Sequence, residues 1–205
     1  MKVTLIRATE RPVDLICEAA SICYDSLPKD KAKLIQQLYK NGHHSVFEHV
    51  SFTYMIEGVS RACTHQLVRH RHASFTQRSQ RYCDESGFDA VVPEGLSEEQ
   101  RARYDAAMDM AADAYAELVS LGVAKEDARM VLPNACETKL YMTLNLRELI
   151  HLANERLCMR AQWEIRRLVG AMVDAVDEEL RWMLVPKCRS GRIACAKPCG
   201  KAGRE

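Results

Sequence analysis

The sequence predicts an α+β fold in which a central, mostly antiparallel sheet is packed with several helices. Segments with strand-like alternation and segments with helical periodicity both occur, but they do not alternate regularly as a parallel βαβ sheet requires. The 205 residues are enough to bury a core within one domain. We predict that one domain spans residues 1–188, and that a Gly-, Lys- and Cys-rich tail, loose towards its end, spans residues 189–205.

Four segments have the composition expected of strands. Residues 1–6 and 139–144 alternate apolar and polar side chains, so each is expected to turn one face towards a core. Residues 50–56 are rich in β-branched and aromatic side chains. Residues 74–83 lack helical periodicity, and we expect this segment to begin as a loop and to run into a strand.

Helices are predicted from apolar residues at helical spacing and from start and stop signals. They cover approximately residues 12–23, 29–40, 61–69, 97–122, 125–132, 146–157 and 161–184. The clearest signals are Pro12 in a first turn, Gly42 as a terminator and the capping box that begins at Ser97. We expect the longest helix to present a core stripe formed by Tyr104, Met108, Ala111, Tyr115 and Leu118. Trp163 and Trp182 are expected in the core, and Gln162 is expected to form hydrogen bonds inside it.

Bulk properties favour a cytoplasmic protein with reduced cysteines. The first residues are too polar for a secretory signal, and no apolar run approaches the length of a membrane span. Nine cysteines form an odd count, and reduced thiols are expected without a secretion signal. A zinc or iron–sulfur site built from Cys188, Cys195 and Cys199, with Cys158 or Cys83 as a fourth ligand, stays open. The spacings match no strong metal-binding pattern, so a loose reduced tail is the preferred interpretation.

Residues 69–82 concentrate hydrogen-bond donors and contain no acidic residue. The donors are Arg69, His70, Arg71, His72, Arg78 and Arg81, interspersed with Ser74, Thr76, Gln77, Ser79 and Gln80. Guanidinium groups present paired donors that match phosphate oxygens. The formal net charge of the chain is only +1, so the positive charge is local and favours a small anionic ligand.

The main alternative from another class is a basic RNA-binding module with a metal-binding cysteine tail. Within residues 69–82, Phe75 and Tyr82 are the only aromatic residues that could stack on bases, which disfavours this alternative. The chain also contains neither GxGxxG nor GxxxxGK[ST]. If it binds a dinucleotide, it does so without a Rossmann turn.

Arg69-His70-Arg71, followed by seven residues and Ser79, resembles the motif of flavin-dependent thymidylate synthases. Further segments resemble the same family in the same order. They are residues 42–49 (GHHSVFEH), 128–133 (ARMVLP), 145–147 (NLR), 154–156 (NER) and 161–165 (AQWEI). Together the matches extend over most of the chain, from about residue 23 to residue 165.

The resemblance implies reductive methylation of dUMP to dTMP. The one-carbon unit would come from 5,10-methylenetetrahydrofolate and the hydride from FAD reduced by NADPH, without a cysteine nucleophile. It also implies a homotetramer whose active sites are shared between subunits, no metal, and no nucleic-acid or membrane partner. The protein would then contribute positioning and electrostatic stabilisation, for which arginines are well suited.

The resemblance assigns residues to each ligand. The dUMP-binding positions would be Gln66, Arg69, Gln77, Ser79, Gln80, Arg81, Arg129 and Arg156. Arg156 would be the catalytic residue, because it resembles the arginine that holds the uracil edge. The FAD-binding positions would be Ser45, Arg69, His70, Arg71, Gln77, Asn145, Arg147 and His151. Gln77 departs from the pattern, since some relatives carry Glu there.

Two features of the FAD set follow from helix geometry alone. If a helix begins near Leu146, Asn145 can cap it, and Arg147 and His151 lie one turn apart on one face. Without the resemblance, Arg147, His151 and Arg156 would form an ordinary solvated face, on which Glu148 and Glu155 pair with arginines. A metal site made by His43, His44 and His49 with Glu48 is disfavoured, since the spacing matches no HExxH helix.

Overall fold

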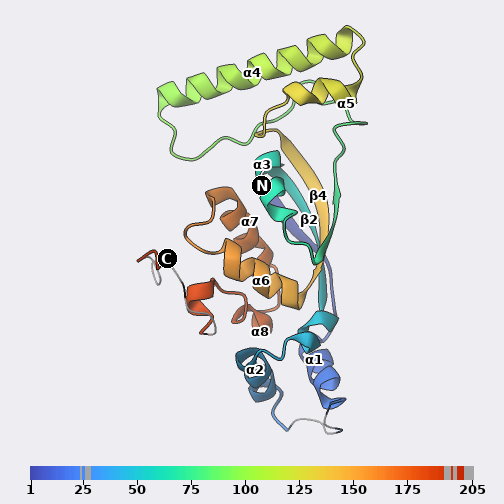
Figure 1. The fold of residues 1–205 in the computed structure, drawn as a ribbon, viewed down its shortest axis with the longest axis vertical. Helices are drawn as coiled ribbons and strands as arrows, with labels where there is room; N and C mark the ends of the chain where they lie inside the picture. The colour runs from blue at the N-terminus through green and yellow to red at the C-terminus, as the bar shows by residue number, and fades with distance from the viewer. Residues whose placement is uncertain (24, 26–28, 192–194, 196–197, 201–205) are drawn as a thin grey trace. The chain divides into compact units, whose positions relative to one another are not determined.

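The computed structural model describes residues 1–23, 25, 29–191, 195 and 198–200 (Figure 1). The chain forms two compact units, of which the first contains residues 1–2, 56–66 and 76–140. The second contains residues 3–55, 67–75 and 141–205. Most of the predicted cysteine-rich tail beyond residue 191 lies outside the described residues.

A four-stranded sheet has the strand order β1-β2-β4-β3. The strands are β1 (Lys2–Ala8), β2 (Ser51–Ser60), β3 (Ala73–Gln77) and β4 (Glu137–Asn145). Antiparallel pairing brings opposite ends of β2 and β4 together: the Leu146 amide donates to the Val50 carbonyl at 2.7 Å, and the Arg61 amide donates to the Cys136 carbonyl at 3.0 Å. With the helices described below, this confirms the predicted α+β class.

The segment from residue 73 to residue 83 reverses the predicted order of loop and strand. β3 comes first and ends at Gln77, and the Arg78 amide then donates to the Lys139 carbonyl at 2.9 Å. Polar residues occupy both faces of this strand, and it lies at the edge of the sheet. β3 therefore forms because it pairs with β4, and not because its own residues have an apolar pattern. The local sequence does not indicate this pairing.

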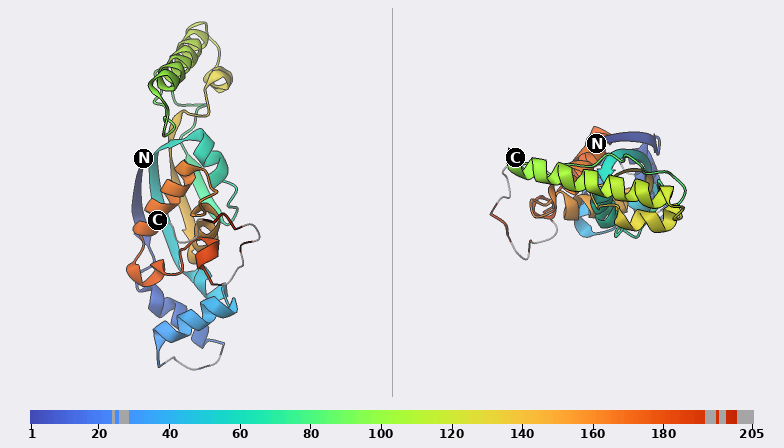
Figure 2. Two further views of the ribbon diagram at one scale, coloured as in Figure 1. Left: turned by 90° about the vertical axis from the view of Figure 1, so that its left-hand side faces the viewer. Right: turned by 90° about the horizontal axis from the view of Figure 1, so that it is seen from above.

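The second unit contains most of the helices. They are α1 (Pro12–Ser21), α2 (Lys31–Asn41), α6 (Leu146–Arg156), α7 (Trp163–Asp174) and α8 (Glu178–Arg181), with short 3-10 turns η1 (Ser45–His49) and η3 (Lys187–Arg189). α6 and α7 cover one face of the strands (Figures 1 and 2). The buried Tyr54 hydroxyl on β2 donates to the Met172 carbonyl on α7 at 3.2 Å, which fixes that helix to the sheet.

The single helix predicted over residues 161–184 is wrong in its continuity, because α7 ends at Asp174 and α8 begins at Glu178. Arg181 supports the break by donating to the carbonyl oxygens of Val176 and Asp174 at 2.7 and 2.8 Å. Gln162 is exposed rather than internal, and its side chain caps α7. Trp182 is 40% exposed, so its predicted place in the core is also wrong.

The first unit contains α3 (Arg61–Leu67, of which the last residue belongs to the second unit), α4 (Glu98–Ser120), α5 (Lys125–Ala128) and the 3-10 turn η2 (Arg129–Val131). The predicted capping box of α4 is present, with Ser97 and Gln100 bonded reciprocally at 3.2 and 2.9 Å. Of the predicted core stripe, Tyr115 is fully buried, and the other members are half-buried. The predicted face of α4 is therefore buried at Tyr115 and only partly buried at its other positions.

Gly58 is the glycine whose replacement should cost most stability. Its φ is +68°, and an added Cβ would lie 2.9 Å from the Met1 nitrogen. We expect Gly58→Ala to lower the free energy of unfolding by about 1–3 kcal/mol, measured by denaturant titration. Gly87→Ala is the matched control, since Gly87 has the same φ and open space around it. Equal losses in the two variants would show that the contact with Met1 contributes nothing.

All nine cysteines are free thiols, in agreement with the reduced state predicted. Cys17, Cys63 and Cys136 are buried, and Cys188 is exposed. Among the described residues, no helix combines the length and the apolar character needed to cross a bilayer.

Candidate active site

A cavity of about 680 Å³ in the second unit gathers side chains from segments far apart in the sequence. Its lining includes Asn145, Arg147 and His151, which are three of the predicted FAD positions. The other lining residues are His44, Glu48, His72, Glu148, Ile150, Asn154, Glu155 and Lys187. Helix α6 thus supplies most of one wall, and the rest comes from η1 with the preceding His44, from the segment after α3, and from Lys187 of η3.

The N-terminal end of α6 has the predicted geometry. Asn145 is the N-cap, and its Oδ1 accepts a hydrogen bond from the Glu148 amide at 2.9 Å. One helical turn places Arg147 and His151 on the wall of the same cavity. Arg147 also forms an ion pair with Glu48 on η1, which holds its guanidinium at the cavity rim.

A chain of hydrogen bonds runs from the cavity-lining Glu148 through the buried His70 to the half-buried Arg156. His70 Nδ1 lies 3.0 Å from Glu148 Oε1, and both residues are only 5% exposed. Arg156 Nε donates to His70 Nε2 at 3.1 Å. The His151 ring packs beside the His70 ring with centroids 5.4 Å apart. The structure thereby brings the predicted catalytic arginine together with two predicted FAD positions.

Two glutamates of α6 do not form the arginine pairs that a solvated helix face would have. Glu148 is buried against His70 rather than paired with an arginine on a solvated surface. Glu155 pairs with Lys187 at 2.9 Å, and this bond lowers the pKa of the Glu155 carboxyl. α6 is therefore partly an internal helix, because its polar positions face a cavity and a buried histidine.

The remaining FAD positions of the second unit are more exposed. Ser45 begins η1, next to the cavity-lining His44, and is exposed. Arg69 and Arg71 flank the buried His70 and are exposed as well. The motif therefore alternates, with one inward imidazole between two guanidinium groups at the surface.

The predicted dUMP positions lie mainly in the first unit. The Gln77 amide nitrogen donates to the hydroxyls of Thr64 and Thr138 at 3.1 and 3.3 Å. Both amide hydrogens are thus directed to neighbouring threonines. Gln66 is half-buried on α3, and Gln80 is 9% exposed.

Glu126 brings Arg81 and Arg129 to one place in the first unit. Arg81 Nε donates to the Glu126 carboxylate at 2.7 Å, and Arg129 Nε donates to the Glu126 backbone carbonyl at 3.0 Å. Ser79 Oγ accepts from the Arg81 amide at 3.2 Å, which orders the turn that carries this arginine. Hydrogen bonds therefore link three predicted dUMP positions to Glu126 or to one another, and of the three only Arg81 bonds to its carboxylate in these contacts.

Arg61 is a cation that sequence reasoning missed. Burial lowers the pKa of its guanidinium, and the nearby positive charge of Arg129 lowers it further. The negative charge of Glu85 acts in the opposite direction and raises it, so Arg61 lies near both a cation and a carboxylate. The signal was present in its position, since a cation in the first turn of α3 is disfavoured by the helix dipole.

Arg78, by contrast, forms an ion pair within the first unit. Its Nε donates to the buried Glu85 carboxylate at 3.0 Å and raises its own pKa through that bond. The cationic stretch of residues 69–82 is thus divided between internal pairing and exposed charge. Local composition could not show the partner, because Glu85 lies outside the stretch.

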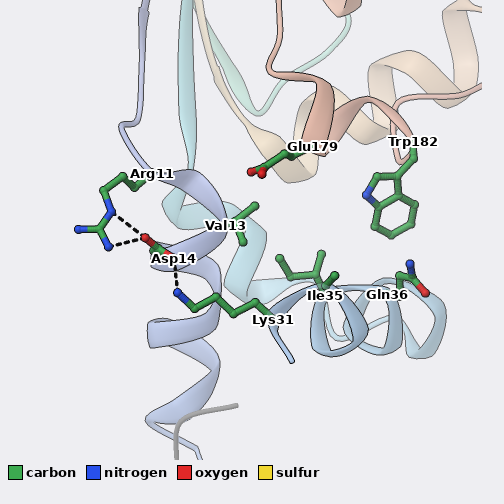
Figure 3. Close-up of a pocket in the computed structure, with 9 residues that line it drawn as sticks. Arg11, Val13, Asp14, Lys31, Ile35, Gln36, Glu179 and Trp182 are labelled. Atoms are coloured by element: carbon green, nitrogen blue, oxygen red, sulfur yellow. Dashed lines mark hydrogen bonds and ion pairs between the residues drawn. The ribbon is translucent and has the colours of Figure 1, made fainter. Parts of the chain in front are cut away.

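A second cavity of about 490 Å³ lies among α1, α2 and α8 and contains none of the predicted site residues (Figure 3). Asp14 at its edge accepts from Arg11 and Lys31 at 2.7 and 2.5 Å. The bonds to Lys31 and Arg11 lower the pKa of the Asp14 carboxyl, and their positive charges balance its negative charge. We therefore assign it a structural role in joining α1 to α2.

The residues considered as metal ligands contact other side chains in the structure. Glu48 pairs with Arg147, and the His44 ring stacks on Tyr39 at 5.9 Å. Within the described part of the chain, the group with metal-binding geometry is His70, Glu148 and His151, whose ligand atoms lie within 4.8 Å of one another. Arg156 donates to this group, and a cation at that point disfavours a second one.

Comparison with known proteins gives consistent results. The family model described as thymidylate synthase complementing protein matches residues 4–180. A flavin-dependent thymidylate synthase from Geobacter sulfurreducens is 47% identical, covering 96% of this chain and 94% of that protein. One from Pyrococcus furiosus is 40% identical, covering 92% and 86%.

A solved structure supports the same fold. Thymidylate synthase X from Helicobacter pylori, crystallised with FAD and dUMP, has a TM-score of 0.75 at 24% identity, covering 90% of this chain and 97% of that chain. Together with the matched family model and the relatives above, this leads to one conclusion. The chain belongs to the flavin-dependent thymidylate synthase family.

Proposed function

We propose that the chain converts dUMP to dTMP with methylenetetrahydrofolate as one-carbon donor and NADPH-reduced FAD as hydride source. The observation that carries the proposal is the convergence of Asn145, Arg147 and His151 on one cavity, backed by the buried His70. The family resemblance assigns all four residues to FAD, and residues 76–140 of the first unit separate His70 from the other three along the chain.

The donor set around the cavity fits FAD. A pyrophosphate is anionic and matches the N-terminal end of α6 together with the guanidinium of Arg147. The imidazole of His151 and the amide of Asn145 add neutral hydrogen-bonding groups. Bound FAD would supply the hydride, and the protein would hold it and shape the electrostatics around the pyrimidine.

Arg156 is proposed to stabilise negative charge on the uracil ring. A guanidinium is a donor-only cationic group, so Arg156 is suited to stabilise charge rather than to act as a base. The bond to His70 at 3.1 Å holds Nε and limits the orientations available to the rest of the group. Such preorganisation lowers the cost of aligning the charge during reaction.

Arg81, Arg129 and Ser79 are proposed to bind the dUMP phosphate, with Arg61 as an additional cation. Their convergence near Glu126 supports this assignment. Gln66, Arg69, Gln77 and Gln80 are proposed to complete the nucleotide contacts. Arg69 and Gln77 would touch both ligands.

The most buried cysteines are poor candidates for nucleophiles. Burial raises the pKa of Cys136 to about 12, and it raises that of Cys17 as well. A thiol that stays protonated near neutral pH is unreactive towards the pyrimidine ring. Cys17 and Cys136 are therefore unsuited to serve as the nucleophile.

We further propose a cytoplasmic homotetramer with active sites shared between subunits. Light scattering on the purified protein should give four times the mass of the chain. A monodisperse monomer that still binds FAD and dUMP would contradict the shared-site proposal.

An absorbance spectrum of the purified protein, recorded with FAD and then with added dUMP, tests the proposed function. We expect a bound flavin spectrum that dUMP perturbs, because both ligands would meet at one site. Failure to bind FAD, combined with RNA affinity that falls steeply with salt, would favour the RNA-binding alternative.

A further inference from the structure

We infer that Glu148 is a positioning residue that acts on Arg156 through His70. Glu148 fixes the tautomer of the His70 ring, and the ring in turn holds the Arg156 guanidinium. The inference deepens the proposed function, since it rests on the role of Arg156 in that reaction. The residues involved are all in the second unit, and each contact between them is direct.

The direction of each hydrogen bond follows from chemistry. A guanidinium has only N–H donors, so His70 Nε2 must be the acceptor in its contact with Arg156 at 3.1 Å. A neutral imidazole with an accepting Nε2 carries its proton on Nδ1. That proton points to Glu148 Oε1 at 3.0 Å. An ionised carboxylate can only accept, so Glu148 selects this tautomer and disfavours the other.

Burial makes the selection effective. Glu148 and His70 are each 5% exposed, so water competes weakly for either group. The amide of Glu148 is itself held by Asn145 at 2.9 Å, which fixes the start of the helix that carries the carboxylate. The neighbouring charged and titratable groups are Arg156 on one side and the His151 ring at 5.4 Å on the other.

The alternative states of His70 would disturb Arg156. In the Nε2–H tautomer, two N–H groups would face each other across the contact. In the imidazolium form, a second positive charge would stand beside the guanidinium. Either state removes the acceptor that holds Arg156 Nε, so the arginine would sample orientations in which its charge is not aimed at the pyrimidine.

Nitrogen-15 NMR of the histidine rings in the FAD-free protein tests the tautomer directly. The seven histidines can be told apart by substitution, and His70→Gln identifies the relevant signal. We expect the Nδ1–H form in the unmodified protein. In Glu148→Gln, an amide can donate as well as accept, and we expect the signal to move towards the Nε2–H form.

Glu155→Gln is the matched control for this spectrum. Glu155 lies on the same helix but pairs with Lys187, so its replacement should leave the His70 tautomer unchanged. If Glu148→Gln fails to fold, the unmodified protein still decides the question. An Nε2–H ring there would overturn the inference.

Kinetics supply the second readout. With FAD bound, we expect Glu148→Gln to lower kcat by about 10- to 100-fold, by analogy with the loss when the hydrogen-bond partner that orients a metal-ligating histidine is removed. The KM for dUMP should change little, because the phosphate contacts lie on other residues. An unaltered tautomer together with an unaltered kcat would overturn the inference and leave the proposed function intact. If the protein does not make dTMP at all, the proposed function fails while the tautomer result stands on its own.

Discussion

Replacing Arg156 with alanine is expected to abolish thymidylate formation while FAD remains bound. The residue lies at the end of α6, and its Nε is held by the buried His70. Alanine removes the only group proposed to offset negative charge on the uracil ring. Loss of such a stabilising donor costs roughly 100- to 1000-fold in turnover, and here the whole charge is lost. Single-turnover dTMP formation with reduced flavin measures the effect.

Two further variants make the Arg156 result specific. Arg156→Lys keeps a positive charge but loses the planar fork, so we expect turnover well below that of the unmodified protein yet above that of Arg156→Ala. Arg160→Ala removes an exposed arginine four positions along the chain and should leave turnover unchanged. Retained dTMP formation by Arg156→Ala, with normal circular dichroism, would remove Arg156 from the catalytic role.

Local sequence signals located most elements, because caps and periodicity act over a few residues. Pro12, Ser97 and Gly42 mark helix ends where the structure has them. Errors arose where distant partners decide the outcome. β3 exists because it pairs with β4, and the break before α8 depends on Arg181 reaching back to carbonyls of the preceding turn.

The same distinction applies to the candidate site. Helix spacing was sufficient to place Arg147 and His151 on one face of a helix, since that relation is local. It took the family resemblance to assign that face to a ligand, and the structure places both residues in the lining of one cavity. The partner of His70 could not be predicted, because Glu148 is 78 positions away and has the appearance of a solvated helix residue. For Arg61 the local signal was only its place in the first turn of α3, and its nearness to Arg129 and Glu85 is established by the fold.

Two substitutions among the proposed dUMP-binding residues should change the affinity for dUMP in opposite directions. Arg81→Ala should weaken dUMP binding by about 1.5–3 kcal/mol, the value of one hydrogen bond to a charged group. This corresponds to about a 10- to 150-fold rise in Kd, measured by isothermal titration. Glu126→Gln should strengthen binding, because the carboxylate that accepts from Arg81 at 2.7 Å competes with the phosphate for it.

The gain from Glu126→Gln is limited by the exposure of the pair. Arg81 and Glu126 are each about half exposed, at 52% and 47%, so their attraction is worth at most about 1 kcal/mol. Affinity should therefore rise by no more than about fivefold. In the double variant, the Glu126 substitution should have no further effect, because the arginine it competes for is absent. If Glu126→Gln instead weakens dUMP binding, the carboxylate orders Arg81 for the ligand rather than competing with it, and the proposed competition is wrong.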